Sequence, residues 1–361
     1  MRLSRRLCAL AAATLVTVAC ADDEEQPDRL TGPTPDIVQA GGPGLAIYGV
    51  GQINRAIPHP CRAPEYRQFD FWLGMWNIEN ANGDNIGTSI ITSELDGCVV
   101  MEDFIGAAGF AGRSLNIYDA DTDMWYETFV DGLIGNFRLT GGLQGDDMVM
   151  TGSQTIIQFF PTFAIRQRDT EVTWSPLSGG RVRQSFETSF DGAPAQTTFD
   201  GTYIPAATLD RADPTVFRVC ELNAPFRELD FWLGSWTVSS APGPELGVSD
   251  VTADLNGCLI EENFVTPKGY KNRSFMYFDF DQDSWFRTFA DESGEHVELS
   301  GGFEDGALVL TGTDIGRDGR DVDLRVTIAP QSDGAVLQTW EVSHDGGASW
   351  KTDLTLDYQP R

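Results

Sequence analysis

Four polar residue types recur at matching positions in the two halves of the chain, each within a short segment that alternates apolar and polar side chains. The pairs are Glu102 and Glu262, Arg113 and Arg273, Thr128 and Thr288, and Gln184 and Gln338. Successive side chains of a β-strand point to opposite faces, so a polar residue spaced by two from apolar residues shares their face. In one interpretation all eight line an apolar interior, as the few polar groups that fix the head of a small ligand.

The same groups have a second interpretation, in which they only stabilise the fold. A buried charge must be paired to be tolerated, so the Arg would be the counter-ion of the Glu and would close one end of a barrel. In a third interpretation, a Glu in an apolar pocket has a raised pKa and acts as the general acid or base of a hydrolase or isomerase. A neighbouring Arg would lower that pKa instead, and we therefore assign no catalytic residue.

Histidine is scarce in this chain. His59, His296 and His344 have no His at the matching position of the other half. This excludes a duplicated His-ligated haem or zinc centre, leaves a site in one copy open, and gives no support to a Ser-His-Asp arrangement. The Asp-x-Asp-x-Asp segments that start at Asp119 and Asp279 lack the Gly and Glu of a calcium loop and are typical of hairpin turns. We expect no cofactor and no bound metal.

These candidate residues belong to a tandem duplication. The octapeptide Phe69–Trp76 returns 160 positions later as Leu229–Trp236, with six of its eight positions identical. Arg-Ser, Gly-Gly and Thr-Gly pairs keep that offset until a change in loop length shifts it by six. We expect the octapeptide to open each copy and its Trp side chains to plug one end of a barrel. The residues to which we assign a structural role are Gly74, Trp76, Gly234 and Trp236.

Each copy has the pattern of β-structure throughout. Runs of alternating apolar and polar residues are separated by Gly, Asp and Asn, and no segment after the first residues keeps a helical period. Roughly eight to ten strands joined by short hairpins favour an up-and-down barrel over a sandwich. We predict an all-β protein with two tandem antiparallel up-and-down β-barrels, at 59–205 and 219–361, with a linker at 206–218.

The N-terminus is typical of an export signal. Arg2, Arg5 and Arg6 precede an apolar run that ends at Cys20. This resembles a bacterial lipoprotein signal, which implies a signal peptide at 1–19, lipidation of Cys20 and a flexible tether at 20–58. We expect a lipoprotein on the periplasmic side of the cell envelope, at the outer membrane. Cleavage by ordinary signal peptidase would give a soluble periplasmic or secreted protein instead.

The chain is strongly acidic. Its 25 Lys and Arg residues against 54 Asp and Glu residues give a formal net charge of −29. Such a surface repels phosphates and anionic headgroups, so we expect no nucleic-acid partner and contact with a membrane only through the anchor at Cys20. Charge and composition leave the oligomeric state open.

Four cysteines remain after the N-terminal region, and four allow three pairings. Each copy holds one cysteine before the octapeptide and one in a Gly-Cys turn after it. The duplication therefore predicts the disulfides Cys61–Cys98 and Cys220–Cys258. Two thiols per copy without a Cys-x-x-Cys spacing do not favour zinc.

The octapeptide also carries a resemblance. Gly74-x-Trp76 and Gly234-x-Trp236 resemble the Gly-x-Trp at the first strand of lipocalin-like (calycin) barrels. The longer string FDFWLGxW, followed by Gly-Cys, Arg-Ser and Tyr-Asp, resembles an uncharacterised bacterial domain family, the FWLGxW family, which has no established activity. The resemblance covers both copies and implies a lipocalin-like barrel with an internal cavity.

Together these observations favour a binding protein over an enzyme. We expect an exported lipoprotein that binds small apolar molecules in its barrel interiors. The alternatives are a structural or protein-interaction module of the cell envelope, and a hydrolase or isomerase that uses an inward Glu.

Overall fold

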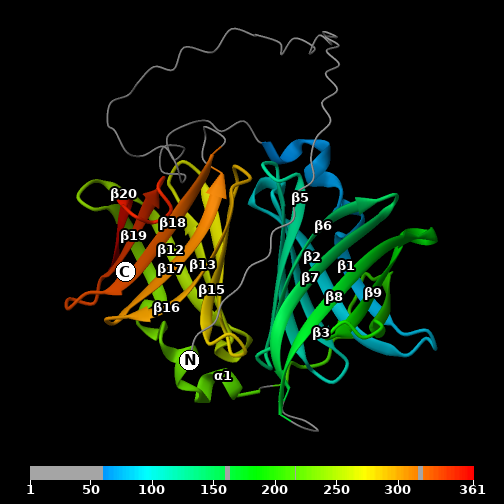
Figure 1. Ribbon diagram of the computed structural model, residues 1–361. Coiled ribbons are helices and arrows are strands. Elements are labelled where there is room, and N and C mark those ends of the chain that lie inside the picture. Colours follow the sequence, from blue (N-terminus) through cyan, green and yellow to red (C-terminus); the bar gives the residue numbers. More distant parts are fainter. Residues whose placement is uncertain (1–59, 159–162, 216, 316–319) are drawn as a thin grey trace, which may run out of the picture. The chain divides into compact units, whose positions relative to one another are not determined.

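The computed structural model describes residues 60–158, 163–215, 217–315 and 320–361 (Figure 1). The predicted signal peptide, the predicted lipidation site Cys20 and the predicted tether lie outside these residues. All described residues belong to one compact unit of the chain. Among them, no helix has the length and the apolar character needed to cross a membrane.

The described residues form two closed barrels of ten antiparallel strands each, which confirms the predicted fold class (Figure 1). Neighbouring strands in each barrel are consecutive in the sequence, and the first strand closes on the tenth, as in an up-and-down barrel. The first barrel, cyan to green in Figure 1, comprises β1 Gly74–Glu79, β2 Asn85–Glu94, β3 Val99–Gly106, β4 Ala111–Asp119, β5 Met124–Asp131, β6 Asn136–Gln144, β7 Asp147–Gln158, β8 Ala164–Leu177, β9 Arg181–Phe190 and β10 Gln196–Pro205.

The second barrel repeats this arrangement strand for strand. It comprises β11 Gly234–Ser240, β12 Glu245–Asp254, β13 Leu259–Val265, β14 Lys271–Asp279, β15 Ser284–Asp291, β16 His296–Glu304, β17 Ala307–Ile315, β18 Asp321–Pro330, β19 Val336–Ser343 and β20 Lys351–Pro360. The short helices are η1 Pro60–Arg62, η2 Pro64–Arg67, η3 Asp70–Trp72, η4 Leu95–Gly97, η5 Ser178–Gly180, α1 Val219–Leu222, η6 Ala224–Arg227, η7 Asp230–Trp232 and η8 Leu255–Gly257. The strand registers therefore match positions of the two barrels directly.

The octapeptide forms a plug at one end of each barrel, as the sequence predicts. In the first barrel the ring of Trp72, on η3, stacks on Phe69 and packs against Trp174 of β8. The indole Nε1 of Trp76 donates a hydrogen bond of 2.9 Å to the carbonyl of Trp72, and Trp236 repeats this bond to Trp232 at the same distance. Burying each large aromatic side chain contributes about 1.5–3 kcal/mol to folding, so the plug ties η3 firmly to the strands.

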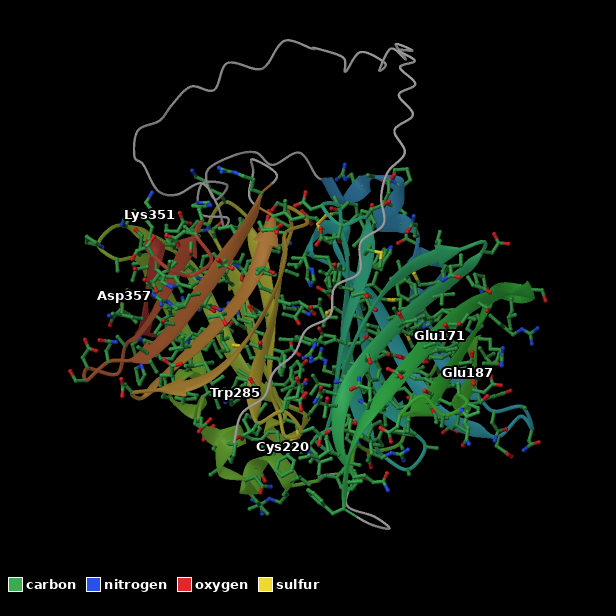
Figure 2. The ribbon with its side chains drawn as sticks, in the orientation of Figure 1. Glu171, Glu187, Cys220, Trp285, Lys351 and Asp357 are labelled. Atoms are coloured by element: carbon green, nitrogen blue, oxygen red, sulfur yellow. A yellow bond between two sulfur atoms is a disulfide. The ribbon has the colours of Figure 1, made fainter. Side chains whose placement is uncertain are left out.

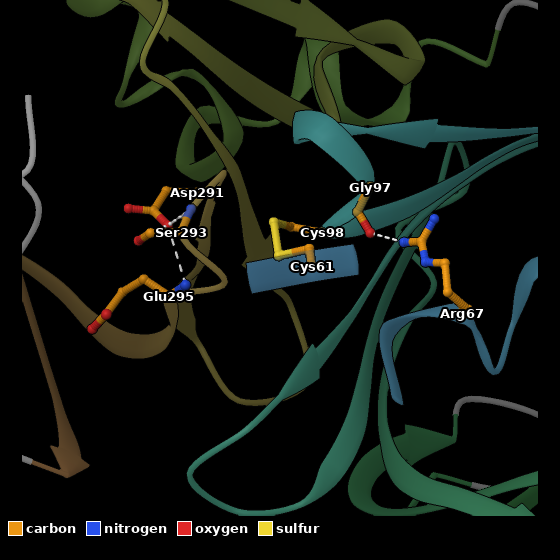
Figure 3. Close-up of a disulfide and its surroundings, with 7 residues drawn as sticks. All are labelled: Cys61, Arg67, Gly97, Cys98, Asp291, Ser293 and Glu295. Atoms are coloured by element: carbon orange, nitrogen blue, oxygen red, sulfur yellow. Dashed lines mark hydrogen bonds between the residues drawn. A yellow bond between two sulfur atoms is a disulfide. The ribbon is translucent and has the colours of Figure 1, made fainter. Parts of the chain in front are cut away.

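Both predicted disulfides are formed, Cys61–Cys98 and Cys220–Cys258. Each joins the segment before the plug to the turn after the second strand of its barrel. Figure 3 shows the first, with Arg67 beside it donating a hydrogen bond to the carbonyl of Gly97. Gly97 has φ +99°, and a Cβ there would meet the Arg67 guanidinium, so this turn requires glycine.

The outer faces of the barrels carry much of the acidic charge. Glu171 on β8 and Glu187 on β9 lie directly opposite each other across the two strands, on the outside of the first barrel (Figure 2). Thr170 and Val172, the neighbours of Glu171 along β8, point inward, since strand side chains alternate. Glu171 is exposed to solvent and therefore offers a control position for variants of the interior.

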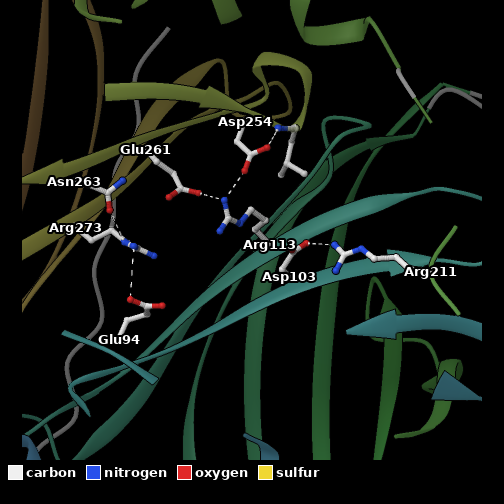
Figure 4. A network of polar contacts seen from close by, with 9 residues as sticks. Glu94, Asp103, Arg113, Arg211, Asp254, Glu261, Asn263 and Arg273 are labelled. Carbon is white, nitrogen blue, oxygen red and sulfur yellow. Dashed lines mark hydrogen bonds and ion pairs between the residues drawn. The ribbon is translucent and has the colours of Figure 1, made fainter. Parts of the chain in front are cut away.

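The two barrels contact each other through pseudo-twofold related residues. Thr128 Oγ1 and Thr288 Oγ1, which are 160 positions apart, lie 2.7 Å from each other. Arg113 forms ion pairs of 2.5 Å with Asp254 and with Glu261, and its counterpart Arg273 approaches Glu94 at 3.9 Å (Figure 4). A contact between equivalent residues is the mark of an isologous interface, so the duplicated barrels pack as the two subunits of a symmetric dimer would.

Candidate functional site

The first barrel encloses a cavity of about 380 Å³. Its lining comes from the inward faces of the strands and from the loops opposite the plug. The residues that line it include Glu102, Glu127, Gln184, Tyr203, Phe104, Phe110, Phe129, Phe137, Phe186, Phe190, Phe199, Asp131, Asn136, Arg168, Thr170, Thr188 and Thr198. The volume is in the range of small-molecule sites.

Glu102 lies at the floor of the cavity, near the plug. The side chain is 4% exposed, and Ser89 Oγ donates a hydrogen bond of 2.7 Å to its Oε1. The hydroxyl of Tyr203 lies 3.2 Å from the same oxygen and 2.6 Å from Gln184 Oε1. Burial raises the pKa of Glu102 to about 7, although the hydrogen bonds from Ser89 and Tyr203 oppose the shift. The carboxyl therefore changes its charge near neutral pH.

Glu127 is a second carboxyl at the floor. It lies on β5, two positions from Trp125, whose ring contacts the plug residue Phe69. Its side chain is 2% exposed, and its Oε2 atom has no hydrogen-bond partner among the described residues. Burial, and next the charge of Glu102, raise the pKa of Glu127 well above its ordinary value. Two carboxyls thus share an interior in which no described cation pairs with either of them.

Above the floor the wall is aromatic and the rim is polar. Phe129 and Phe137 stack with ring centroids 4.7 Å apart, and Phe186 meets Phe137 and Phe199 edge to face. At the far end Arg168 donates hydrogen bonds to the carbonyl of Asn136 and to Gln154 Oε1. The site therefore offers acidic groups at its closed end, an apolar wall, and paired polar groups at the other end.

The second barrel has a different floor. Glu262, the counterpart of Glu102, accepts hydrogen bonds from Ser249 and Tyr358, as Glu102 does from Ser89 and Tyr203. The counterpart of Glu127, however, is Arg287, whose Nη2 lies 3.0 Å from Glu262 Oε2. The guanidinium of Arg287 also lies over the rings of Trp340 and Phe289, at 5.3 and 5.8 Å from their centroids. This buried carboxylate has its counter-ion within the barrel.

The wall of the second barrel is filled where the first is hollow. Strand registers match Thr170 with Leu324 and Thr188 with Val342. They also match Phe186 with Trp340, and the bulkier residues of the second barrel are buried. At these three positions the larger, buried side chains of the second barrel fill space that is open in the first. The two copies have thus diverged in their interiors while their frames stayed alike.

The structure places half of the predicted site residues inside the barrels. Glu102 and Gln184 line the cavity, and Glu262 and Gln338 are buried in the second interior. The prediction was wrong for the residues of the fourth and fifth strands of each barrel, whose side chains point outward into the contact between the barrels. These residues are Arg113, Thr128, Arg273 and Thr288.

The physical reason is that β4 and β14 are buried on both faces. Leu115 and Ile117 are fully buried beside Arg113, which made their face look like the interior. The inward residues of β4 are Ser114 and Asn116, because Ser114 pairs with Glu102 across the strands. A shift of one position moves every side chain of a strand to the other face. Arg113 is therefore not the counter-ion of Glu102.

Sequence reasoning missed the second floor residue of each barrel. Glu127 and Arg287 occupy matching positions 160 apart and carry opposite charges. A shared site is indicated by residues of the same type at matching positions, and this reversal of charge gives no such identity. It was the available signal for the difference between the two interiors.

The acidic segments at Asp119 and Asp279 form hairpin turns, as predicted. Asp119 Oδ1 accepts a hydrogen bond from the backbone N–H of Asp121, and Asp279 does the same for Asp281. Within the described ranges, no group of three or more His, Cys, Asp and Glu side chains is arranged to hold a metal ion.

The arrangement can bind a molecule and can transfer a proton. A carboxyl with a pKa of about 7 in an apolar pocket has the value that a general acid or base needs. The hypothesis of a hydrolase or isomerase that uses an inward Glu stays a prediction. Neither the models of known protein families nor the curated proteins include a match to this chain.

Proposed function

We propose that this protein is a non-enzymatic binding protein that holds one small, mainly apolar molecule inside its first barrel. The observation that carries the proposal is the cavity of about 380 Å³ with its aromatic wall and its few polar groups at the closed end. Phe129, Phe137 and Phe186 are half-buried although they point inward, because they face open space. Covering this apolar surface with an apolar molecule is favourable, because the surface is then removed from water.

The second barrel supports the proposal by contrast. Its interior carries Leu324, Val342 and Trp340 where the first has smaller residues, and its floor charge is paired. We therefore assign a structural role to the second barrel. The second barrel stabilises the protein, and the first barrel binds the ligand.

The proposal includes the cellular setting predicted for the N-terminus. Lipidation of Cys20 would anchor both barrels on the periplasmic side of the cell envelope, where a binding protein meets molecules that enter the cell. Mass spectrometry of the mature N-terminus tests this part: an acylated Cys20 supports it, and a free N-terminus at another residue contradicts it.

Native mass spectrometry of the full chain from its own host tests the binding role. We expect the protein to carry one small molecule that is released on unfolding. A protein that is empty after mild extraction, and that also fails to take up small aromatic probes, would contradict the proposal.

A cavity-filling variant makes the test specific to the first barrel. Thr170→Leu with Thr188→Val introduces the residues of the second barrel, Leu324 and Val342. We expect small aromatic probes to bind at least about tenfold more weakly, a loss of about 1.4 kcal/mol. The circular dichroism spectrum should be unchanged. Glu171→Gln, on the outer face of β8, is the control and should bind as the parent does.

A further inference from the structure

The floor of the first barrel resembles the surroundings of the Arg287 guanidinium, which is buried in the second barrel. In the second barrel, Arg287 is held by Glu262, by the hydroxyl of Ser274 at 2.9 Å, and by the rings of Trp340 and Phe289. The first barrel has a residue of the same kind at each of these four positions. The counterparts are Glu102, Ser114, Phe186 and Phe129.

The first barrel lacks the cation itself. Glu127 takes the position of Arg287, so a second carboxyl is added where a positive charge is removed. Its Oε2 has no hydrogen-bond partner among the described residues, although Glu127 is only 2% exposed. An unpaired buried carboxylate is costly, and aromatic faces attract cations. The site therefore has the acceptors and the rings for a positive charge that the chain does not supply.

We propose that the ligand of the first barrel is an organic cation, a primary amine or guanidine with an apolar body, whose charged head binds between Glu102 and Glu127. This inference rests on the proposed function and names the chemical class of the ligand. An ammonium or guanidinium head supplies the N–H donors that Glu127 Oε2 lacks. The apolar body then lies along Phe129, Phe137 and Phe186.

Arg168 does not fill this role. It lies on β8, six positions from Trp174, which packs against the plug residue Trp72, and this places Arg168 about 20 Å along the strand from the plug. Its guanidinium is engaged by Asn136 and Gln154, and the carboxylates that act on it are Asp281, Asp279 and Asp131. The floor carboxyls are left for the ligand.

The test compares three probes that differ only in the group at the end of one chain. They are 2-phenylethylamine, which is a cation at neutral pH, n-propylbenzene, in which a methyl group replaces the ammonium, and 3-phenylpropanoate, an anion. Isothermal titration of the full chain measures their affinities. We expect the amine to bind at least about tenfold more tightly than propylbenzene and the anion to bind most weakly.

Two variants show whether the preference arises at the floor. Glu127→Gln keeps the shape and removes the charge, and it should remove the preference for the amine while propylbenzene binds as before. Glu127→Arg builds in the cation of the second barrel, and it should abolish amine binding without loss of thermal stability, because the new guanidinium can pair with Glu102. Glu171→Gln should keep the preference.

The outcomes separate the two proposals. Equal or tighter binding of propylbenzene or of the anion, or a preference for the amine that survives in Glu127→Gln, overturns the cationic ligand and leaves the binding function standing. A neutral or anionic molecule released from the native protein has the same consequence. If none of the three probes binds and the native protein is empty, both proposals are overturned.

Discussion

Glu262 and Arg287 face each other at 3.0 Å inside the second barrel, whereas their counterparts in the first barrel, Glu102 and Glu127, are both acidic. This reversal of charge, together with the larger wall residues Leu324 and Val342, distinguishes the interiors of two barrels that share a plug, a disulfide and a strand order. One barrel of the duplicated chain thus holds the counter-ion of its buried carboxylate, and the other does not. The cavity of about 380 Å³ lies in the barrel whose floor carboxyls have no such counter-ion.

The ion pair of the second barrel should be essential to its stability. Arg287→Met leaves Glu262 buried without a cation, and breaking a buried pair in this way costs about 3–5 kcal/mol. We expect calorimetry to show a clear fall in the unfolding temperature. The double variant Glu262→Gln with Arg287→Met removes both charges and should recover much of the loss. A single variant as stable as the parent would show that the pair is not holding the interior together.

The contact between the barrels should depend more on Arg113 than on Arg273. Arg113 pairs at 2.5 Å with Glu261, whose side chain is 6% exposed, so Arg113→Ala strands a buried carboxylate at a cost of about 1–3 kcal/mol. Arg273 lies 3.9 Å from the more exposed Glu94, and its loss should cost under about 1 kcal/mol. Urea unfolding of the two variants measures both. The reverse order would contradict this account of the interface.

The frame of the molecule could be predicted from the sequence because it rests on local signals that occur twice. The octapeptide, the Gly-Cys turns and the two-residue alternation identify strands, hairpins and disulfides, and the duplication removes the ambiguity of cysteine pairing. Each of these signals depends on residues close together in the chain. These local signals were sufficient to predict the two barrels and the plug of each.

The sequence could not show which face of a strand points into the barrel where the strand is buried on both faces. Alternation identifies the interior only when the other face meets water, and β4 has Leu115 and Ile117 against the second barrel and Ser114 and Asn116 inside. The direction of Arg113 thus depended on a contact between positions 141 residues apart in the chain. The cavity depended likewise on side-chain volumes summed across several strands.

The buried carboxyls should make the stability of the unliganded protein fall as the pH rises. Burial raises the pKa of Glu102 from 4.5 to about 7, so the folded state binds the proton more tightly than the unfolded state does. The contribution of Glu102 to the free energy of unfolding is fully present below about pH 4.5 and is lost as the pH rises through about 7, on the order of 3 kcal/mol in all. Glu127 adds to this fall, because burial raises its pKa well above the ordinary value too.

Glu127→Gln tests this pH dependence of stability. The variant removes one titrating buried carboxyl, so its unfolding temperature should fall less than that of the parent between about pH 5 and about pH 8. Glu171→Gln changes an exposed carboxylate and should follow the parent curve. Parallel curves for the parent and Glu127→Gln would show that Glu127 does not contribute to the pH dependence of stability in this range.

Affinity for the amine should change with pH in the opposite sense. The cationic head binds the ionised floor, so a proton must leave Glu102 or Glu127 when the ligand enters. Because the pKa of Glu102 is about 7, we expect the affinity for 2-phenylethylamine to rise by up to about tenfold per pH unit from about pH 5 to about pH 7 and to level off above that. Titrations in buffers of different ionisation enthalpy should detect the released proton. Propylbenzene carries no charge and should show neither effect, so a pH dependence shared by both probes would place its origin outside the floor.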